Sequence, residues 1–128
     1  MFFALTFYLL TCKHALCDFA LQGRLKGDNK KWILLSRKGL LHAFDHLIGS
    51  AIVLTFMNLF LQTNWLIIPL IAVLDFVLHL VIDWRKNIIV KHYGWSQSDR
   101  QFWVCTSIDQ IAHLTCYIYY CWLLYLTV

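Results

Sequence analysis

The chain has 128 residues, enough for one domain, and 60% of them are hydrophobic while 14% are charged. A soluble domain of this size needs far more polar surface, so the composition excludes an ordinary soluble protein and indicates a membrane protein. The formal net charge of +4 is modest; membrane topology explains the basic segments first, and we expect no nucleic acid partner.

The first expected transmembrane helix spans about residues 2–21. A helix needs roughly 20 residues to cross about 30 Å of hydrocarbon. This stretch is long enough, although it carries Lys13, His14 and Asp18 in its second half. These polar residues, and the lack of a basic start, argue against a cleavable signal peptide.

Three further apolar stretches follow, at about 39–61, 65–84 and 102–126. The link around Asn64 between the first two of these is so short that we expect a tight helical hairpin. Together the four stretches predict an all-α fold: an integral membrane bundle of about four transmembrane helices, in a single domain over residues 1–128.

Ten of the eleven Lys and Arg residues lie in two links, from Arg24 to Lys38 and from Arg85 to Arg100. In a bundle of four spans these links share one side, which the positive-inside rule places in the cytoplasm. We therefore predict a multi-pass protein of the inner (cytoplasmic) membrane, with both termini on the non-cytoplasmic side. The segment 23–38 has two interpretations, a helix along the lipid headgroups and an ordinary anchoring loop.

The acidic residues show the opposite distribution, because five of the seven lie within the apolar stretches. Since the spans alternate in direction, their Asp and His residues all fall in the half nearest the cytoplasm. They are His14 and Asp18, then His42, Asp45 and His46, then Asp75, His79 and Asp83, and finally Asp109 and His113. A charge at a helix centre costs roughly 2.5–3.5 kcal/mol, so these acids must be paired, metal-bound or hydrated.

Many of these residues are spaced four apart, and side chains four apart project from the same face of an α-helix. The pairs are His14/Asp18, His42/His46, Asp75/His79, His79/Asp83 and Asp109/His113. Each helix is thus expected to turn one polar stripe toward the bundle interior. Hydrogen bonding between helices is one explanation; for ten such residues at one depth we favour a binding site.

Imidazole and carboxylate groups are the usual ligands of a divalent metal without thiolates, which suits Zn, Mn or Fe. The predicted metal ligands are His14, Asp18, His42, Asp45, His46, His79, Asp83 and His113. Asp75 and Asp109 are the candidates for a catalytic general base. The set suits either one metal with supporting residues or two metals that share a carboxylate. A metal at this depth can activate water against a membrane lipid or a lipid-linked substrate.

Four short motifs carry a resemblance to a known family. They are His14-Ala-Leu-Cys-Asp18-Phe19-Ala-Leu21-Gln22, His42…His46, His79-Leu-Val-Ile-Asp83 and Asp109-Gln110-Ile-Ala-His113-Leu114. In this order, over nearly the whole chain, they resemble a family of small bacterial and phage membrane proteins with a domain of unknown function, DUF3307. The resemblance implies a helical membrane protein and supplies no established reaction. The pattern also resembles, more distantly and by analogy only, membrane-bound metal-dependent hydrolases.

Three functions follow as hypotheses. The first is a metal-dependent hydrolase of a lipid or lipid-linked substrate. The second is a transporter or channel for protons or metal ions, because intramembrane Asp and His residues form relays in such proteins. The third is a non-enzymatic membrane scaffold whose basic links dock an acidic partner or anionic headgroups. Each is compatible with a homo-oligomer.

Overall fold

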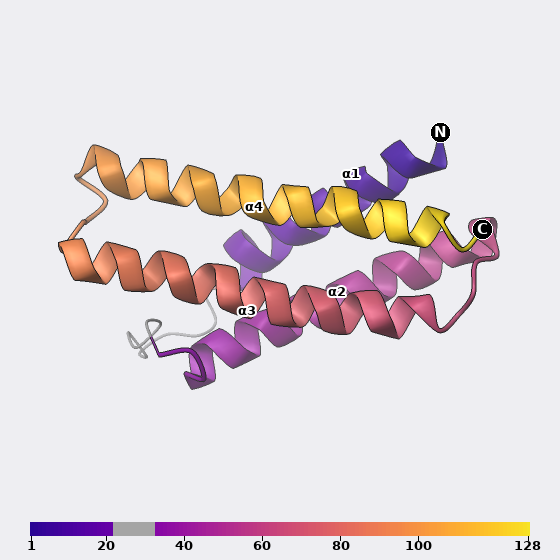
Figure 1. The fold of residues 1–128 in the computed structure, drawn as a ribbon, viewed down its shortest axis with the longest axis horizontal. Coiled ribbons are helices and arrows are strands. Elements are labelled where there is room, and N and C mark those ends of the chain that lie inside the picture. The colour runs from indigo at the N-terminus through magenta and orange to yellow at the C-terminus, as the bar shows by residue number, and fades with distance from the viewer. Residues whose placement is uncertain (22–32) are drawn as a thin grey trace.

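The computed structural model describes residues 1–21 and 33–128, and the described chain is all-helical. Its elements are α1 (Phe2–Ala15), a π-helical segment η1 (Leu16–Leu21), α2 (Arg37–Leu61), α3 (Ile67–Tyr93) and α4 (Arg100–Tyr125). The long helices run side by side as a bundle (Figure 1). The interfacial-helix interpretation of segment 23–38 falls mostly on residues 22–32, outside the described residues.

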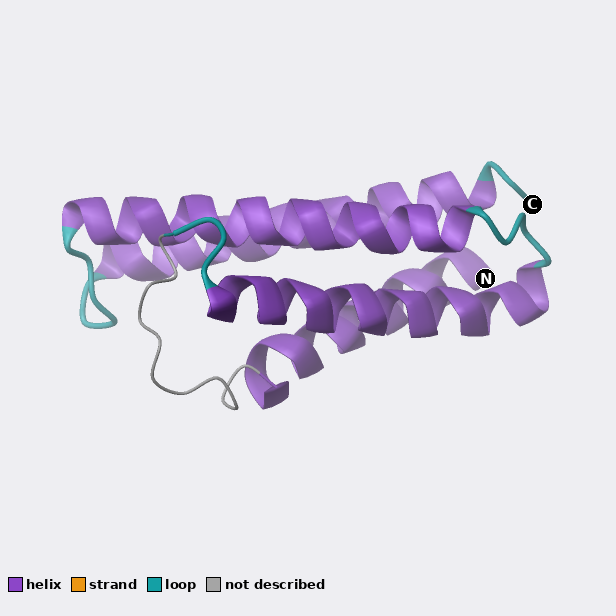
Figure 2. Cartoon of the chain, turned by 90° about the horizontal axis from the view of Figure 1, so that it is seen from below, coloured by secondary structure: helices purple, strands orange, loops and turns teal. Residues whose placement is uncertain are grey.

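The two ends of the bundle differ as the alternating topology requires. Both termini and the link between α2 and α3 lie at one end, while the link between α3 and α4 lies at the other (Figures 1 and 2). Since this second link belongs to the basic segment that ends at Arg100, one end of the bundle is basic. The end that carries the termini has no Lys or Arg among residues 1–12.

Helices α2 and α3 form the expected hairpin. Helix α2 ends at Leu61 because Gln62 adopts the left-handed conformation, with φ 54° and ψ 39°. The side chain of Asn58 then closes the turn, since its Oδ1 accepts a 2.7 Å hydrogen bond from the backbone N–H of Thr63. Helix α3 starts at Ile67, after five linking residues, and packs along the length of α2.

Helix α3 is longer than the sequence suggested. The apolar stretch ends at about Trp84, but the helix continues to Tyr93 and stops at Gly94, which has a φ of 67°. Arg and Lys are good helix formers, so the chain stays helical after its hydrophobicity falls. Hydropathy therefore marked the end of the apolar run and not the end of the helix.

The turn before α4 is held by its own polar groups. Asp99, the residue before the helix, accepts hydrogen bonds at Oδ2 from the backbone N–H of Ser96 at 2.7 Å and from its hydroxyl at 2.9 Å. These bonds favour the ionised carboxylate and lower the pKa of Asp99 below its ordinary value. The turn thus fixes where α4 begins.

Three helical segments are long and apolar enough to cross a membrane: Phe2–Leu21, Arg37–Leu61 and Ile67–Tyr93. Helix α4 has 26 residues, which is sufficient length. It is less apolar than the others, because it carries Asp109, Gln110 and His113 together with several tyrosines. The fourth expected span is therefore a helix of the bundle, but its composition alone does not mark it as a crossing.

The distribution of side chains is the reverse of that in a soluble bundle. Large apolar residues such as Leu59, Leu70 and Ile111 are more than half exposed on the outer faces of α2, α3 and α4. Histidines and carboxylates are buried between the helices. Apolar side chains outside and polar ones inside are what a lipid environment requires.

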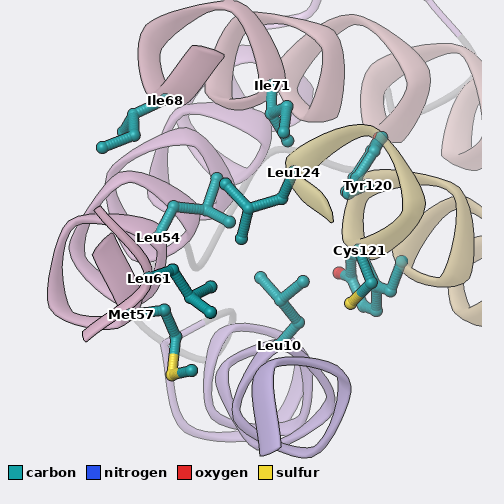
Figure 3. Packing of buried hydrophobic residues seen from close by; sticks show 10 residues of the cluster. Leu10, Leu54, Met57, Leu61, Ile68, Ile71, Tyr120, Cys121 and Leu124 are labelled. Carbon is teal, nitrogen blue, oxygen red and sulfur yellow. The ribbon is translucent and has the colours of Figure 1, made fainter. Parts of the chain in front are cut away.

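The half of the bundle near the termini is packed by apolar side chains from all four helices (Figure 3). Leu10 of α1, Leu54 of α2, Ile71 of α3 and Leu124 of α4 are completely buried there. This apolar cluster closes one half of the bundle and leaves the polar residues in the other half.

Candidate metal centre

The polar residues of the four helices gather between the helices in the half toward the basic links. The structure arranges eight of the ten sequence candidates in three overlapping groups of converging side chains. These groups are His14, Asp18, His46 and His79; then His42, His79 and Asp83; and finally Asp83, Asp109 and His113. We call these eight residues, with Lys13, Asp75, Lys86 and Gln110, the polar cluster. Donor atoms within each group of three or four lie within 4.8 Å of one another.

The carboxylate of Asp18 lies at the middle of the first group. Its Oδ1 is 3.1 Å from Nε2 of His46 and 3.2 Å from Nε2 of His42. Its Oδ2 is 3.2 Å from Nε2 of His14. Three imidazoles from two helices therefore turn the same ring atom toward one carboxylate.

Asp83 on α3 has a similar position on the other side of the cluster. Its Oδ2 lies 3.5 Å from Nε2 of His42 and 3.9 Å from Nε2 of His79, and its Oδ1 lies 3.3 Å from Nε2 of His113. Two ligands of one tetrahedral zinc, each bonded at 2.0–2.1 Å, are about 3.4 Å apart. The spacing of these donor atoms therefore fits a shared metal ion.

The five buried imidazoles are packed closely. Ring centroids are 3.4 Å apart for His46 and His79, 3.9 Å for His79 and His113, and 4.9 Å for His14 and His113. His42 lies 5.2 Å from His79. Apolar packing offers no reason to gather five imidazoles, whereas a metal does.

Two of these imidazoles have no hydrogen-bond partner at either nitrogen. They are His42, 4% exposed, and His79, 1% exposed. Nε2 of His42 is 3.2 Å from Asp18, but the two groups are not oriented for a hydrogen bond. Buried polar atoms are nearly always satisfied, and leaving one unpaired costs about 1–3 kcal/mol. The unpaired nitrogens of both rings therefore indicate that a ligand binds between these imidazoles and the carboxylates.

The charges of the polar cluster agree with a divalent cation. It contains four carboxylates, Asp18, Asp75, Asp83 and Asp109, and two ammonium groups, Lys13 and Lys86. Two negative charges are left over when the imidazoles are neutral. In the low dielectric of the bundle this excess is costly, and one ion of charge +2 would balance it.

A small pocket reaches the cluster from the basic end of the bundle. It has a volume of about 20 Å³ and is lined by His42, His79 and Asp83 together with Lys38 and Trp84. This is room for about one water molecule. The pocket touches both imidazoles that lack hydrogen bonds, and the carboxylate of Asp83 beside them.

The π-helical segment Leu16–Leu21 is a feature that the sequence did not reveal. It carries Asp18, and the wider turn changes the direction of that side chain relative to an α-helix. Asp18 still lies close to His14. Short π-helical segments of this kind often occur at functional sites. Nothing in the residues from Leu16 to Leu21 explains why this turn is wide.

Two sequence candidates lie outside the three groups. Asp75, expected as a general base, forms an ion pair with Lys13, whose Nζ is 2.8 Å from its Oδ2. The hydroxyl of Ser50 donates to the same oxygen at 2.6 Å. Asp45, expected as a ligand, is half-buried on α2 and does not converge with the three groups.

Sequence reasoning considered Gln110 only as a possible interhelical hydrogen bonder, and it gave no supporting role to Lys13, Ser50, Lys86 or Tyr117. Lys13 alone offered a direct signal, because an unpaired cation within an apolar span is costly. Tyr117 follows His113 by four residues and so lies on the same face of α4. The others are ordinary in type and position, and only the packing of the helices reveals their contacts.

Comparison with known proteins gives one match. The model of a family described as protein of unknown function, DUF3307, matches residues 5–128. No curated protein and no solved structure matches the chain.

Proposed function

The chain belongs to the DUF3307 family, and from this premise we propose that it is a metal-dependent hydrolase of the membrane. Its substrate is a lipid or a lipid-linked molecule, and its cofactor is a divalent ion, Zn, Mn or Fe. The substrate reaches the polar cluster from the basic end of the bundle, which we place in the cytoplasm. The finding that carries the proposal is the buried pair His42 and His79, whose four ring nitrogens lack hydrogen bonds.

A bound ion would supply Lewis-acid chemistry, because it polarises a phosphoryl or carbonyl oxygen and lowers the pKa of water to near neutrality. The chain would hold it with imidazole and carboxylate groups and keep bulk water away. Asp109 suits the role of general base. Its Oδ2 is held at 2.8 Å by Lys86, while its buried Oδ1 has no hydrogen-bond partner and is free to accept a proton.

The substrate class follows from the surroundings of the small pocket. Its lining combines the cation Lys38 with apolar side chains such as Leu34, Leu80 and Trp84. A cation beside apolar groups suits an amphiphile that carries a negative charge, such as a lipid phosphate. The distant likeness to membrane-bound metal-dependent hydrolases supports the same reaction class by analogy.

A transporter or channel is less favoured because the polar residues occupy only half of the bundle. Among the described residues, none of the types Asp, Glu, Lys, Arg or His occurs in 2–12, 47–74 or 114–128. The apolar cluster around Leu54 and Leu124 fills this half (Figure 3). A proton or metal ion would thus meet no carboxylate, imidazole, ammonium or guanidinium group in these segments on the way to the far side.

The test is a hydrolysis assay on the protein in phospholipid vesicles supplied with Zn, Mn or Fe, following release of phosphate and of fatty acid. Activity should fall at least about 100-fold in His79→Ala and in Asp83→Ala, because each removes a proposed ligand. His92→Ala is the matched control, because this histidine is exposed and lies outside the cluster. Equal activity in all three variants, or no metal-dependent release by the wild type, would overturn the proposal.

A further inference from the structure

We propose that the metal centre is mononuclear and held by His42, His79, Asp83 and Asp18. Hydrogen bonds with Lys13, Gln110 and Asp83 keep His46, His14 and His113 out of the ligand set, and Lys86 does the same for Asp109. This inference rests on the proposed metal site and deepens it, because it reduces eight predicted ligands to four.

The first step concerns Lys13, which lies behind the cluster and is 6% exposed. Its ammonium group has three N–H bonds and meets three acceptors: Oδ2 of Asp75 at 2.8 Å, Oη of Tyr117 at 3.1 Å and Nδ1 of His46 at 3.2 Å. An ammonium group donates and never accepts. Nδ1 of His46 must therefore be an acceptor without a proton.

The proton of a neutral His46 consequently lies on Nε2. This atom donates to Oδ1 of Asp18 at 3.1 Å. A nitrogen that carries a proton has no lone pair for a metal. His46 thus orients the carboxylate of Asp18 and is a positioning residue, although its ring lies among the ligands.

The same reasoning extends to His14 through Gln110. The amide Nε2 of Gln110 donates to Oδ2 of Asp18 and to Oδ2 of Asp109, at 3.3 Å each, and this fixes its orientation. Its Oε1 then faces Nε2 of His14 at 3.0 Å and can only accept. Nε2 of His14 therefore carries the proton, and Nδ1 accepts the hydrogen bond of Tyr117 at 2.9 Å.

Space for Lys13 is built into the neighbouring helix. A Cβ added at Gly49 of α2 would lie 2.6 Å from Cγ of Lys13 and 2.9 Å from its Cδ. No real contact of this kind is that short, so only glycine lets the lysine stem pass to Asp75. The direction of the hydrogen bonds from Lys13 is thus a consequence of how α1 packs on α2.

The second lysine excludes a second metal ion. Nζ of Lys86 is 2.8 Å from Oδ2 of Asp109 and 3.7 Å from Oδ1 of Asp83. The ammonium group of Lys86 thus supplies the positive charge at the third group of donors, Asp83, Asp109 and His113, where a second metal ion would otherwise bind. His113 meanwhile bonds through Nε2 to Oδ1 of Asp83 at 3.3 Å.

What remains for a metal is one set of donors. Both nitrogens of His42 and of His79 lack hydrogen bonds. Nε2 of His79 is 3.9 Å from an oxygen of Asp18 and 3.9 Å from an oxygen of Asp83. The pocket reaches the same two imidazoles. Two imidazoles and two carboxylates are a ligand set that suits Zn, Mn or Fe.

X-ray absorption spectroscopy of the Zn-loaded full chain in detergent tests the inference, because it counts imidazoles bound to zinc. The wild type should bind one Zn with two imidazoles. His42→Ala and His79→Ala should each leave one imidazole, while His14→Ala and His46→Ala should still show two. Three or more imidazoles in the wild type, a lower count in His46→Ala, or two Zn per chain would overturn the inference.

A second measurement needs no variant and so does not depend on their folding. In the Zn-loaded wild type with ¹⁵N-labelled histidine, magnetic resonance should show His14 and His46 with the proton on Nε2. A proton on Nδ1 of either residue would overturn the inference. The two proposals fail differently: zinc bound by another ligand set contradicts only this inference, whereas a wild type that binds no zinc contradicts the proposed metal site itself.

Discussion

At the scale of single residues, the contact between Lys13 and Asp75 sets the orientation of the groups around it. Both side chains are buried, and the carboxylate also accepts a hydrogen bond from Ser50. Burying two charges is costly, and it is offset when each partner is fully hydrogen-bonded. The pair is therefore best understood as the fixed support on which the neighbouring imidazoles are oriented.

Removing one member of this pair should be expensive. Lys13→Met leaves the Asp75 carboxylate buried without a counter-ion, and we expect a loss of about 3–5 kcal/mol in the free energy of unfolding. Unfolding of the purified protein in mixed micelles measures it. The double variant Lys13→Met/Asp75→Asn should lose less than Lys13→Met alone, since no unpaired charge remains.

The exposed cation Arg85 is the matched control for this experiment. Arg85→Met should change the free energy of unfolding by no more than about 0.5 kcal/mol. A similarly small effect for Lys13→Met would mean that the pair contributes little. The same would follow if the double variant lost as much as Lys13→Met and Asp75→Asn lose separately when added together.

The sequence predicted which residue types converge but not the role of each. The spacing of His42, His46 and His79 placed them on inward faces, and the structure brings their rings together. Which nitrogen carries a proton depends on a neighbour's donors, and Lys13 reaches His46 across 33 positions of sequence. Helix periodicity holds no information about such contacts, so ligands and supporting residues looked alike.

At the scale of the elements, the π-helical segment Leu16–Leu21 decides where Asp18 points. An α-helix has 3.6 residues per turn, and a π-helix has more, so the segment displaces every side chain after Ala15 around the helix axis. The sequence analysis assumed α-helical geometry for the whole span 2–21. It therefore predicted that Asp18 faces the bundle interior, but not the π-helical turn that sets the direction of its side chain.

Deleting Leu16 should disturb the position of Asp18 in the site while the segment stays helical. The deletion shifts Asp18 by one residue relative to His14, which is a rotation of about 100° in an α-helix and less in the wider π-helical turn. We expect Zn affinity to fall at least about 100-fold, as for loss of a ligand, while circular dichroism shows unchanged helix content. The control is Leu16→Ala, which shortens an exposed side chain without changing the register.

Wild-type zinc affinity in the Leu16 deletion would show that the π-helical segment does not position the site.

The length of α3 is a second feature that the sequence did not predict. Its last turns, beyond Trp84, place Lys86 against Asp109, a contact that the expected span of 65–84 omitted. The hydropathy signal ended where the helix was still contributing to the cluster.

At the scale of the whole molecule, the alternating direction of the helices could be predicted, because it depends only on the number of long helical stretches. Four long helical stretches and one short link require both termini at the same end, and the structure agrees (Figure 1). Membrane orientation is different in kind, since it depends on the distribution of Lys and Arg relative to a bilayer. It remains a prediction, with the basic links in the cytoplasm.

Cysteine labelling tests this orientation. In a variant whose five native cysteines are replaced by serine, a reagent that cannot cross membranes is added from the non-cytoplasmic side. It should modify Asn64→Cys, which lies in the exposed link between α2 and α3, and leave Gln97→Cys, in the link before α4, unmodified until the membrane is permeabilised. The reverse pattern would invert the topology and move the entrance of the pocket to the other side.

The central claim is that the buried imidazoles hold a divalent metal, and metal content of the purified full chain tests it most directly. The protein is extracted without chelators, and its metals are measured by mass spectrometry. We predict about one equivalent of metal in the wild type and in His92→Ala, and less than about a tenth in His42→Ala/His79→Ala, because ligand loss removes the binding energy. A metal-free wild type, or a double variant that retains its metal, would contradict the account.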